Sequence, residues 1–325
     1  MPRVTSTDIA RAAGVSRTTV SYVLNDTPGA SVSDGTRARI HAAAERLGYA
    51  PSAAARTLRR GRSDLVVAVL PDWPVGTLVE GLLDHLTDAL AVRGLFVLVH
   101  HHRDSRALTD LWRAVTPLAV VGLAPFTPDD ARAMARAGIR VVGTVEPASG
   151  AGAGTFDASQ RGIGALQARH LAGAGHTRLG YATSDDPRLD RFAAARLAGV
   201  EEACAALGLP TVRPLAVPAG QAATDAVRRW SDDGVTAVAA YNDEVALAVL
   251  AGAREAGVPV PAGLAVVGVD DSPGGRVAAP PLTTVAQPVA RQAEHLAAEV
   301  LAALDGRDAP PWPDDGARVV VRGSA

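Results

Sequence analysis

Residues 64–325 alternate between short apolar runs and segments of helix length, and this alternation limits the folds that the chain can adopt. The runs are LVVAVL (65–70), LFVLVH (95–100), LAVVGL (118–123), IRVVGTV (139–145), RLGYA (178–182), AVAAY (237–241) and LAVVGVD (264–270). Strands that alternate with helices form parallel sheets with helices on both faces. Because there are too many such units for one compact sheet, the alternation predicts two α/β lobes.

The first 63 residues differ in charge from the rest of the chain. They contain ten arginines and four acidic residues, which gives a net charge of +6. Of the 32 basic and 34 acidic residues in the whole chain, 22 and 30 therefore belong to residues 64–325, which carry a net charge of −8. This asymmetry is typical of a nucleic-acid-binding segment attached to an acidic body.

Three short helices are predicted in the first 48 residues. Thr5 and Ser16 precede the first two helices as N-caps, and Gly14 suits the left-handed backbone of a tight turn between them. The third helix follows Ser33 and ends near Leu47. Two helices joined by a glycine-containing turn form a helix-turn-helix motif, whose second helix enters the major groove of DNA.

The second of these helices, within VSRTTVSYVLN (15–25), has two different faces. Its apolar residues share one face, and the opposite face carries Arg17, Thr18, Ser21 and Tyr22. An ordinary solvated face of a small helical bundle would have a similar pattern. The net charge of residues 1–63 instead favours hydrogen bonds from this face to base edges and phosphates.

The segment YAPSAAARTLRRGRS (49–63) has the pattern of a short helix that begins at Pro51 and ends at Gly61. Its apolar surface is too small for it to fold alone, because isolated helices shorter than ~12 residues are marginal in water. We therefore expect this helix to form only against a partner.

The chain resembles the lac repressor and galactose repressor family from its head to its last residues. The head and hinge segments are VTSTDIARAAGVSRTTVSYVLN, TRARIHAAAERLGY and PSAAARTLRRG. The body segments are FDASQRGIGALQARHLAGAGHTRLGYA, YNDEVALAVLAGAREAGVPVP, LAVVGVDDSP, PPLTTVAQPV and ARVVVRGSA. The resemblance implies a ligand-responsive transcription regulator, typically a repressor, that binds a palindromic operator in double-stranded DNA as a homodimer.

The resemblance also implies a domain plan. Residues 1–48 would be a helix-turn-helix head, residues 49–63 a hinge helix and linker, and residues 64–325 an effector-binding body. The body would have the fold of periplasmic sugar-binding proteins, with two doubly wound lobes joined by three crossovers. Lobe 1 would comprise about 64–157 and 286–310, and lobe 2 about 158–285 and 311–325.

The DNA contacts implied by the resemblance come from the head and the hinge. They are Thr5, Ser16, Arg17, Thr18, Ser21, Tyr22, Asn25, Ser52, Arg56 and Leu58. Leu58 matches a leucine that each hinge helix wedges into the minor groove, which kinks a duplex; a simple packing leucine is the alternative. Tyr22 stands where these repressors often have arginine, and a phenol cannot make a forked contact with guanine. The operator sequence therefore stays open.

Ligands of open α/β sheets bind beyond the carboxyl ends of the strands. The candidate effector-binding residues there or in matched segments are Asp72, Trp73, Asp157, Arg196, Asn242, Asp270 and Gln287. In the family, the positions that match Arg196, Asn242, Asp270 and Gln287 contact a small effector, usually a sugar or related polyol. Side chains of these polar types can pair with several hydroxyls. Alternatively, Asn242, Asp270 and Asp157 only cap turns, and Trp73 lies at the rim instead of stacking on a sugar.

The sequence contains no motif that indicates another class of function. The GAGAG stretch (150–154) lacks dinucleotide-binding spacing, no G-x-S-x-G nucleophile elbow occurs, and neighbours in the His100–His102 run point to opposite faces of a strand. We therefore expect no catalytic residue, no cofactor and no metal site. A solute-binding or sugar-processing protein on the same fold is the rival function, and the basic head argues against it.

The remaining expectations concern location and assembly. Cys204 is the sole cysteine, no apolar run reaches the ~18 residues of a membrane span, and the N-terminus has no signal-peptide core. We expect a cytoplasmic protein with no membrane partner. No heptad pattern follows VVVRGSA, so a tetramerising coiled coil is not expected. The sequence leaves open whether the effector weakens or strengthens DNA binding.

Overall fold

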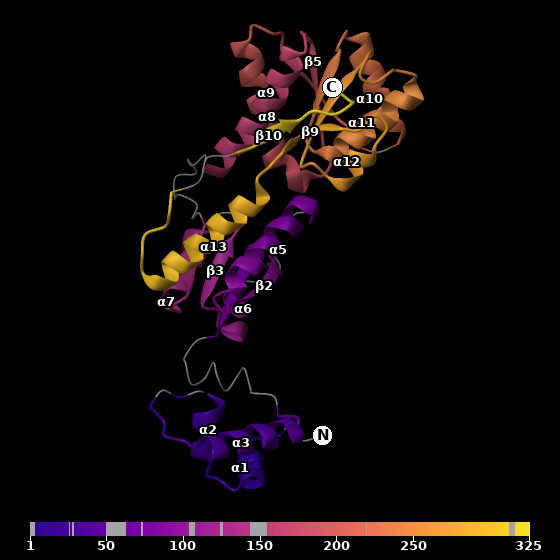
Figure 1. The fold of residues 1–325 in the computed structure, drawn as a ribbon. Helices are drawn as coiled ribbons and strands as arrows, with labels where there is room; N and C mark the ends of the chain where they lie inside the picture. Colours follow the sequence, from indigo (N-terminus) through magenta and orange to yellow (C-terminus); the bar gives the residue numbers. More distant parts are fainter. Residues whose placement is uncertain are drawn as a thin grey trace. The chain divides into compact units, whose positions relative to one another are not determined.

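The computed structural model describes residues 4–25, 27, 29–49, 63–72, 74–103, 108–123, 126–143, 155–218, 220–311 and 316–325, with only the backbone at 155–158. The chain divides into two compact units, residues 1–63 and 64–325. Within the described residues, helices make up the first unit, and two sheets with their covering helices make up the second (Figure 1). The predicted hinge helix lies outside the described residues, as do Ser52, Arg56 and Leu58.

The helices of the first unit begin where the sequence predicts. They are α1 (Ser6–Ala13), α2 (Arg17–Leu24) and α3 (Asp34–Arg46). The backbone N–H and the hydroxyl of Thr5 both donate to Oδ2 of Asp8, at 2.9 and 2.7 Å. Ser16 Oγ accepts the backbone N–H of Thr19 at 3.1 Å, and Gly14 has the predicted left-handed φ of 66°. The bonds between Thr5 and Asp8 fix the start of α1, and Gly14 and the Ser16 cap define the two ends of the turn between α1 and α2.

Apolar side chains from all three helices pack into one small core. Ile9 of α1, Val20 of α2 and Ile40 of α3 are each fully buried, and Val23 is 3% exposed. Since Val20 and Val23 face inward, the opposite side of α2 faces solvent.

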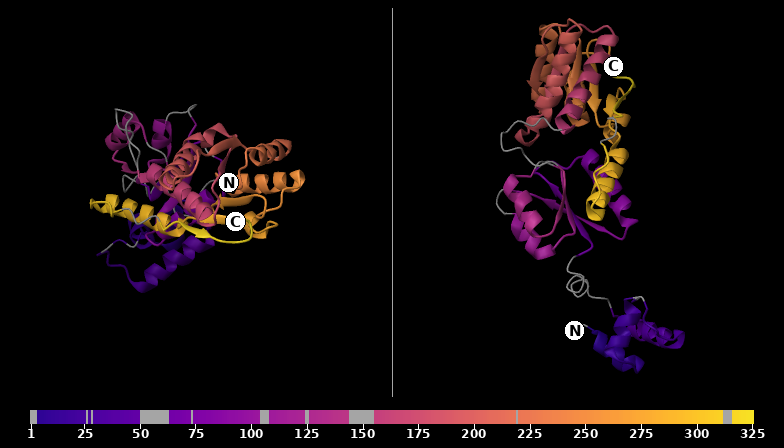
Figure 2. Two further views of the ribbon diagram at one scale, coloured as in Figure 1. Left: turned by 90° about the horizontal axis from the view of Figure 1, so that it is seen from above. Right: turned by 90° about the vertical axis from the view of Figure 1, so that its left-hand side faces the viewer.

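The first sheet of the body is entirely parallel and has the strand order β2-β1-β3-β4. Its strands are β1 (Leu65–Leu70), β2 (Phe96–His101), β3 (Ala119–Gly122) and β4 (Arg140–Val142). Two helices pack together on one face, α5 (Thr77–Ala91) and α13 (Val289–Asp305), and two cover the other, α6 (Leu108–Val115) and α7 (Pro128–Arg136) (Figure 2). This part of the body is lobe 1.

The second sheet, the core of lobe 2, has the order β10-β9-β8-β7-β5-β6 and is parallel except where β10 pairs with β9. Its strands are β5 (Leu179–Thr183), β6 (Arg213–Ala216), β7 (Ala237–Ala240), β8 (Ala265–Val269), β9 (Thr283–Ala286) and β10 (Arg318–Val320). Its helices are α8 (Thr155–Gly173), the 3₁₀ turn η1 (Pro187–Leu189), α9 (Asp190–Ala206), α10 (Gln221–Asp232), α11 (Asp243–Ala256) and α12 (Pro273–Val277).

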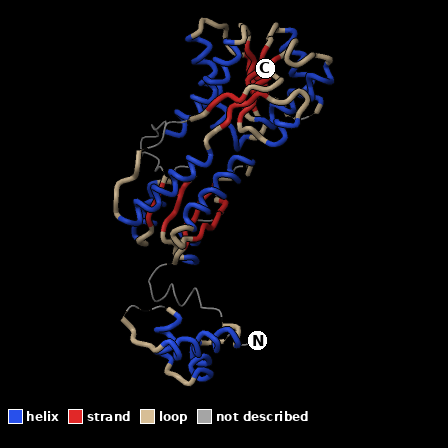
Figure 3. Tube along the Cα trace, viewed as in Figure 1, coloured by secondary structure: helices blue, strands red, loops and turns tan. Residues whose placement is uncertain are grey.

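Strands lie at the centre of each lobe and helices outside them (Figure 3). The chain passes from one lobe to the other between β4 and α8, between β9 and α13, and between α13 and β10. These are the two α/β lobes that the strand–helix alternation predicts and the three crossovers that the resemblance implies. Strands β6, β9 and β10 were not among the predicted apolar runs, because each has only three or four residues, and β6 (RPLA) is also mostly exposed.

Helices α8 and α9 approach each other closely enough for their backbones to touch. A Cβ atom on Gly164 would lie 2.0 Å from the carbonyl oxygen of Arg196, and one on Gly199 would lie 2.0 Å from that of Arg161. Glycine is therefore required on both helices at this crossing. The crossing also sets the position of Arg196, which lies on α9.

Substitution of either crossing glycine should destabilise the body. Gly164→Ala or Gly199→Ala forces the helices apart, and overpacking of this kind costs about 1–3 kcal/mol or more. The matched control is Gly173→Ala at the exposed end of α8, where an added Cβ would meet nothing within 4 Å. That variant should be neutral or more stable by up to about 1 kcal/mol. Urea denaturation of all three checks this, and unchanged stability of Gly164→Ala would contradict the close crossing.

Candidate functional site

The outward face of α2 is the first candidate site. Arg17 and Thr18 are exposed, Tyr22 is 43% exposed, and Ser21 is partly buried. The opposite residues of α2 are fixed in the core of the head, so the orientation of this face is set by packing. A rigid helix that presents a guanidinium, hydroxyls and a phenol has donors and acceptors suited to base edges and phosphates.

The remaining described DNA-contact candidates take part in helix capping. Thr5 caps α1 together with Asp8, and Ser16 caps α2. Asn25, just after α2, donates from Nδ2 to the carbonyl oxygen of Ser21 at 2.6 Å and to its Oγ at 3.2 Å. These three side chains stabilise the ends of α1 and α2, so any contact they make with DNA is an addition to that role.

The second candidate site lies at the carboxyl ends of the strands of lobe 2. Asp270 follows β8 and Gln287 follows β9, and Nε2 of Gln287 donates to Oδ1 of Asp270 at 3.0 Å. The backbone N–H of Asp270 donates to the carbonyl oxygen of Val285 at 2.9 Å. The structure therefore brings two of the predicted effector-binding residues into direct contact.

Arg196 joins this site from within α9 and not from a strand end. Its side chain is 5% exposed. Nε donates to Oε1 of Gln160 at 2.7 Å, and Nη1 donates to the carbonyl oxygen of Tyr241. The guanidinium also lies 4.7 Å from the centroid of the Tyr241 ring, a cation–π distance. Three contacts thus fix the orientation of this buried charge.

The charges at this site influence one another. Burial raises the pKa of Asp270 above its usual value, while the positive charge of Arg196 and the hydrogen bond from Gln287 oppose that increase. Burial likewise raises the pKa of the Tyr241 phenol. A ligand that donates hydrogen bonds to the Asp270 carboxylate would compensate for its lost hydration.

Asn242 has a local role next to this site. It is the N-cap of α11, and its Oδ1 accepts the backbone N–H of Val245 at 3.0 Å. The capping alternative is therefore realised at Asn242. Its position directly after Tyr241 still leaves it beside the Arg196 contact, so an effector contact from its amide stays a prediction.

Sequence reasoning missed Gln160 and Tyr241. Tyr241 ends the predicted AVAAY run and could have been noted as a strand-end residue. Gln160 is 4% exposed on α8 and lies far from Arg196 in sequence, so no local pattern indicates the bond between them.

Asp72 follows β1 in lobe 1 and forms ion pairs with Arg103 at 3.4 Å and with Arg188 of lobe 2 at 3.9 Å. The Asp72 side chain is half exposed, and exposed pairs of this kind contribute little to stability. Trp73 and the side chain of Asp157, in the first turn of α8, lie outside the described part of the chain. Effector contacts from these three residues stay predictions.

Two further features concern metals and membranes. Among the described residues, no group of three or more His, Cys, Asp or Glu side chains could hold a metal ion. The rings of His100 and His102 lie 6.5 Å apart at the end of β2. In the same part of the chain, none of the helices has the length and apolar character needed to cross a membrane.

Two family models match the chain. The model for bacterial regulatory proteins of the lacI family matches residues 5–52, which contain α1, α2 and α3. The model for the periplasmic binding protein-like domain matches residues 168–325, most of which belong to lobe 2. The two candidate sites therefore fall in one matched region each.

Similar proteins extend the match to almost the whole chain. The crystal structure of the lac repressor dimer bound to operator and the anti-inducer ONPF has a TM-score of 0.79 at 22% identity, covers 99% of each chain, and shows the shared fold. A complex of the transcriptional regulator CelR with cellobiose has a TM-score of 0.66 at 26% identity, covering 99% of this chain and 100% of that one. The HTH-type transcriptional regulator GalR of Escherichia coli (strain K12) is 30% identical over 318 residues, which are 93% of this chain and 90% of GalR. The chain belongs to the LacI/GalR family of bacterial transcription regulators.

Proposed function

We propose that this chain is a repressor that binds a palindromic operator in double-stranded DNA as a homodimer, with an affinity modulated by a sugar or related polyol. One observation carries the proposal: the same chain combines a helix-turn-helix head that has an exposed polar face with a body in which Arg196, Asp270 and Gln287 meet at the strand ends of lobe 2. Because its partner is the chromosomal operator, the protein acts in the cytoplasm.

A polyol effector fits the chemistry of this site. The Asp270 carboxylate accepts hydrogen bonds, and the Gln287 amide both donates and accepts them, so together they can pair with neighbouring hydroxyls. The cellobiose complex of the similar regulator CelR supports a sugar. An effector changes DNA affinity only if it binds one state of the protein more tightly than the other, and the sign of the effect decides between induction and co-repression.

We infer that the body acts by binding and not by catalysis. The relatives that match along the whole chain are transcriptional regulators. In addition, the buried Arg196 is held by contacts within the protein, as a fixed recognition group would be. The rival, a solute-binding or sugar-processing protein, does not account for the basic head.

An exposed apolar row on β2 supports self-association. Phe96 and Leu98 form a row on one face of the strand and are 63% and 37% exposed, and Val99 on the opposite face is 39% exposed. Strand β2 is an edge of its sheet, and an edge strand with large exposed apolar side chains is a site for pairing with another chain. We propose that this row lies within the homodimer interface.

The effector proposal predicts a specific loss in Asp270→Asn. The amide replaces a charged acceptor, so affinity for the effector should fall by about tenfold or more, while operator affinity without sugar stays unchanged. Asp129→Asn on α7, where the carboxylate is 90% exposed, is the matched control. Fluorescence anisotropy of labelled operator, titrated with D-galactose, maltose and cellobiose, measures both quantities. An equal sugar response in Asp270→Asn and wild type would reject the assignment.

The DNA proposal predicts that Tyr22→Ala changes which base is preferred at one position of each half-site. The loss on the best operator should be about 1–3 kcal/mol, the usual contribution of one good base contact. His41→Ala, an exposed change on α3, serves as the control. Binding-site selection with both variants and wild type gives the preferences directly, and an unaltered preference in Tyr22→Ala would show that α2 docks differently.

The dimer proposal predicts that Phe96→Arg shifts the protein toward monomer, because it places a charge in the apolar row of β2. Val277→Arg, at an 84% exposed position on α12 in lobe 2, should leave the assembly unchanged. Sedimentation velocity over a concentration series distinguishes the two variants. If Phe96→Arg sediments as wild type does, the interface lies elsewhere.

A further inference from the structure

The turn after β8 has an unusual backbone. Asp270 has a φ of 106° and Asp271 a φ of 53°, so two consecutive residues with side chains adopt positive φ. Such conformations are costly for residues other than glycine and persist only where the surroundings hold them. Since Asp270 is the carboxylate of the proposed effector site, whatever holds this turn also sets the direction of that carboxylate.

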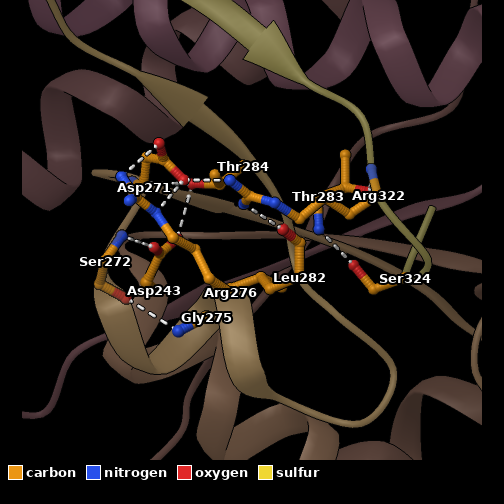
Figure 4. A network of polar contacts seen from close by, with 10 residues as sticks. All are labelled: Asp243, Asp271, Ser272, Gly275, Arg276, Leu282, Thr283, Thr284, Arg322 and Ser324. Atoms are coloured by element: carbon orange, nitrogen blue, oxygen red, sulfur yellow. Dashed lines mark hydrogen bonds and ion pairs between the residues drawn. The ribbon is translucent and has the colours of Figure 1, made fainter.

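One anchor of the turn comes from the C-terminal segment. Nη2 of Arg322 donates to Oδ1 of Asp271, and Nη1 donates to the carbonyl oxygen of Leu282 at 2.8 Å (Figure 4). Arg276 of α12 adds bonds to the same carboxylate, at 2.9 Å from Nη2 to Oδ2 and 3.3 Å from Nε to Oδ1. Partial burial alone would raise the pKa of Asp271, but the bonds from the two arginines outweigh it and lower that pKa.

The second anchor is Asp243, the first residue of α11, which is 1% exposed. Its Oδ2 accepts the backbone N–H of Ser272 at 2.6 Å, and its Oδ1 accepts the hydroxyl of Thr284 at 2.6 Å (Figure 4). A Cβ atom on Gly268 would lie 2.2 Å from that Oδ1, so glycine is needed there to admit the carboxylate. Asp243 therefore ties the residue after the turn to α11 and to β9.

The C-terminal segment that carries Arg322 is itself fixed to the sheet. Ser324 is fully buried. Its Oγ donates to the carbonyl oxygen of Val266 at 2.6 Å and accepts the backbone N–H of Thr283 at 2.8 Å. Arg322 therefore extends toward Asp271 from a backbone segment that is itself hydrogen-bonded to the sheet.

We propose that Asp243 and Arg322 are positioning residues of the effector site, which hold the Asp270–Asp271 turn so that the Asp270 carboxylate stays against Gln287 and the Arg196 charge. Neither residue contacts the effector in this proposal; each acts through the turn. Their influence on effector affinity rests on the proposed function, whereas their hold on the turn does not.

Hydrogen exchange measured by mass spectrometry on the full chain tests the hold on the turn without any effector. Asp243→Asn keeps the size of the side chain, but one oxygen becomes an NH₂ group, so the two acceptor bonds cannot both be kept. Arg322→Met keeps the aliphatic stem and removes the guanidinium. Exchange in a peptide that covers residues 270–276 should accelerate by about tenfold or more in each variant, as expected for loss of a charged hydrogen bond. Exchange in β5 and β7 should not change.

Two matched controls accompany these variants. Asp225→Asn lies on α10 with its carboxylate half exposed, and Arg318→Met lies on the exposed side of β10, four residues before Arg322. In both control variants, hydrogen exchange of the 270–276 peptide should match that of wild type. If Asp243→Asn fails to fold, Arg322→Met tests the same turn from its other side, because the Arg322 side chain is only partly buried.

Titration with D-galactose, maltose and cellobiose supplies the second readout. For a sugar that binds wild type, both variants should weaken binding by about tenfold or more, at a temperature where each remains folded. Unchanged exchange at 270–276, or faster exchange with unchanged sugar affinity, would overturn the positioning role. If none of the sugars binds wild type, that result counts against the sugar effector, and the exchange data still decide whether Asp243 and Arg322 hold the turn.

Discussion

The buried guanidinium of Arg196 is the constraint on which the strand ends of lobe 2 depend. A buried charge is costly unless it is paired, and removal of a single partner leaves much of that cost uncompensated. Arg196 meets this requirement through Gln160 on α8, the carbonyl oxygen of Tyr241 after β7, and the charge of Asp270 after β8. One side chain therefore connects two helices with the ends of two strands. The glycine crossing of α8 and α9 brings the helix that carries Arg196 close to the helix that carries Gln160.

The same arrangement explains why the site suits a neutral, hydroxyl-rich ligand. The charge of Arg196 is largely used within the protein, and the Asp270 carboxylate lies close to it, so the pair offers little net charge to attract an ion. What remains is a set of oriented donors and acceptors at the strand ends, next to the Tyr241 ring. Sites of this kind select by the geometry of hydrogen bonds, because each buried polar group left without a partner costs free energy.

More of the fold than of the candidate site could be predicted from the sequence. Apolar runs and helix caps are local patterns, so Thr5, Ser16 and Gly14 marked the ends of helices correctly, and most strands fell within a residue or two of the predicted runs. Strands β6, β9 and β10 were missed because each has only three or four residues and so forms no long apolar run. The partners of Arg196 and the anchors of the Asp270 turn escaped for another reason. Gln160, Asp243 and Arg322 are brought to the site by helix crossing and strand order, which leave no local pattern at these positions.

Among the described residues, a weak ion pair connects the two lobes, and its weakness bears on where the free energy of a response comes from. The ion pair of Asp72 and Arg188 joins the lobes across 3.9 Å, but both side chains are about half exposed, so solvent screens their attraction. Such a pair cannot by itself bias the arrangement of the lobes strongly. A ligand shifts an equilibrium only by its difference in affinity for the two states. If Arg196 and Asp270 hold the effector as proposed, a strong response of the head requires that the effector also contact lobe 1 differently in the two states.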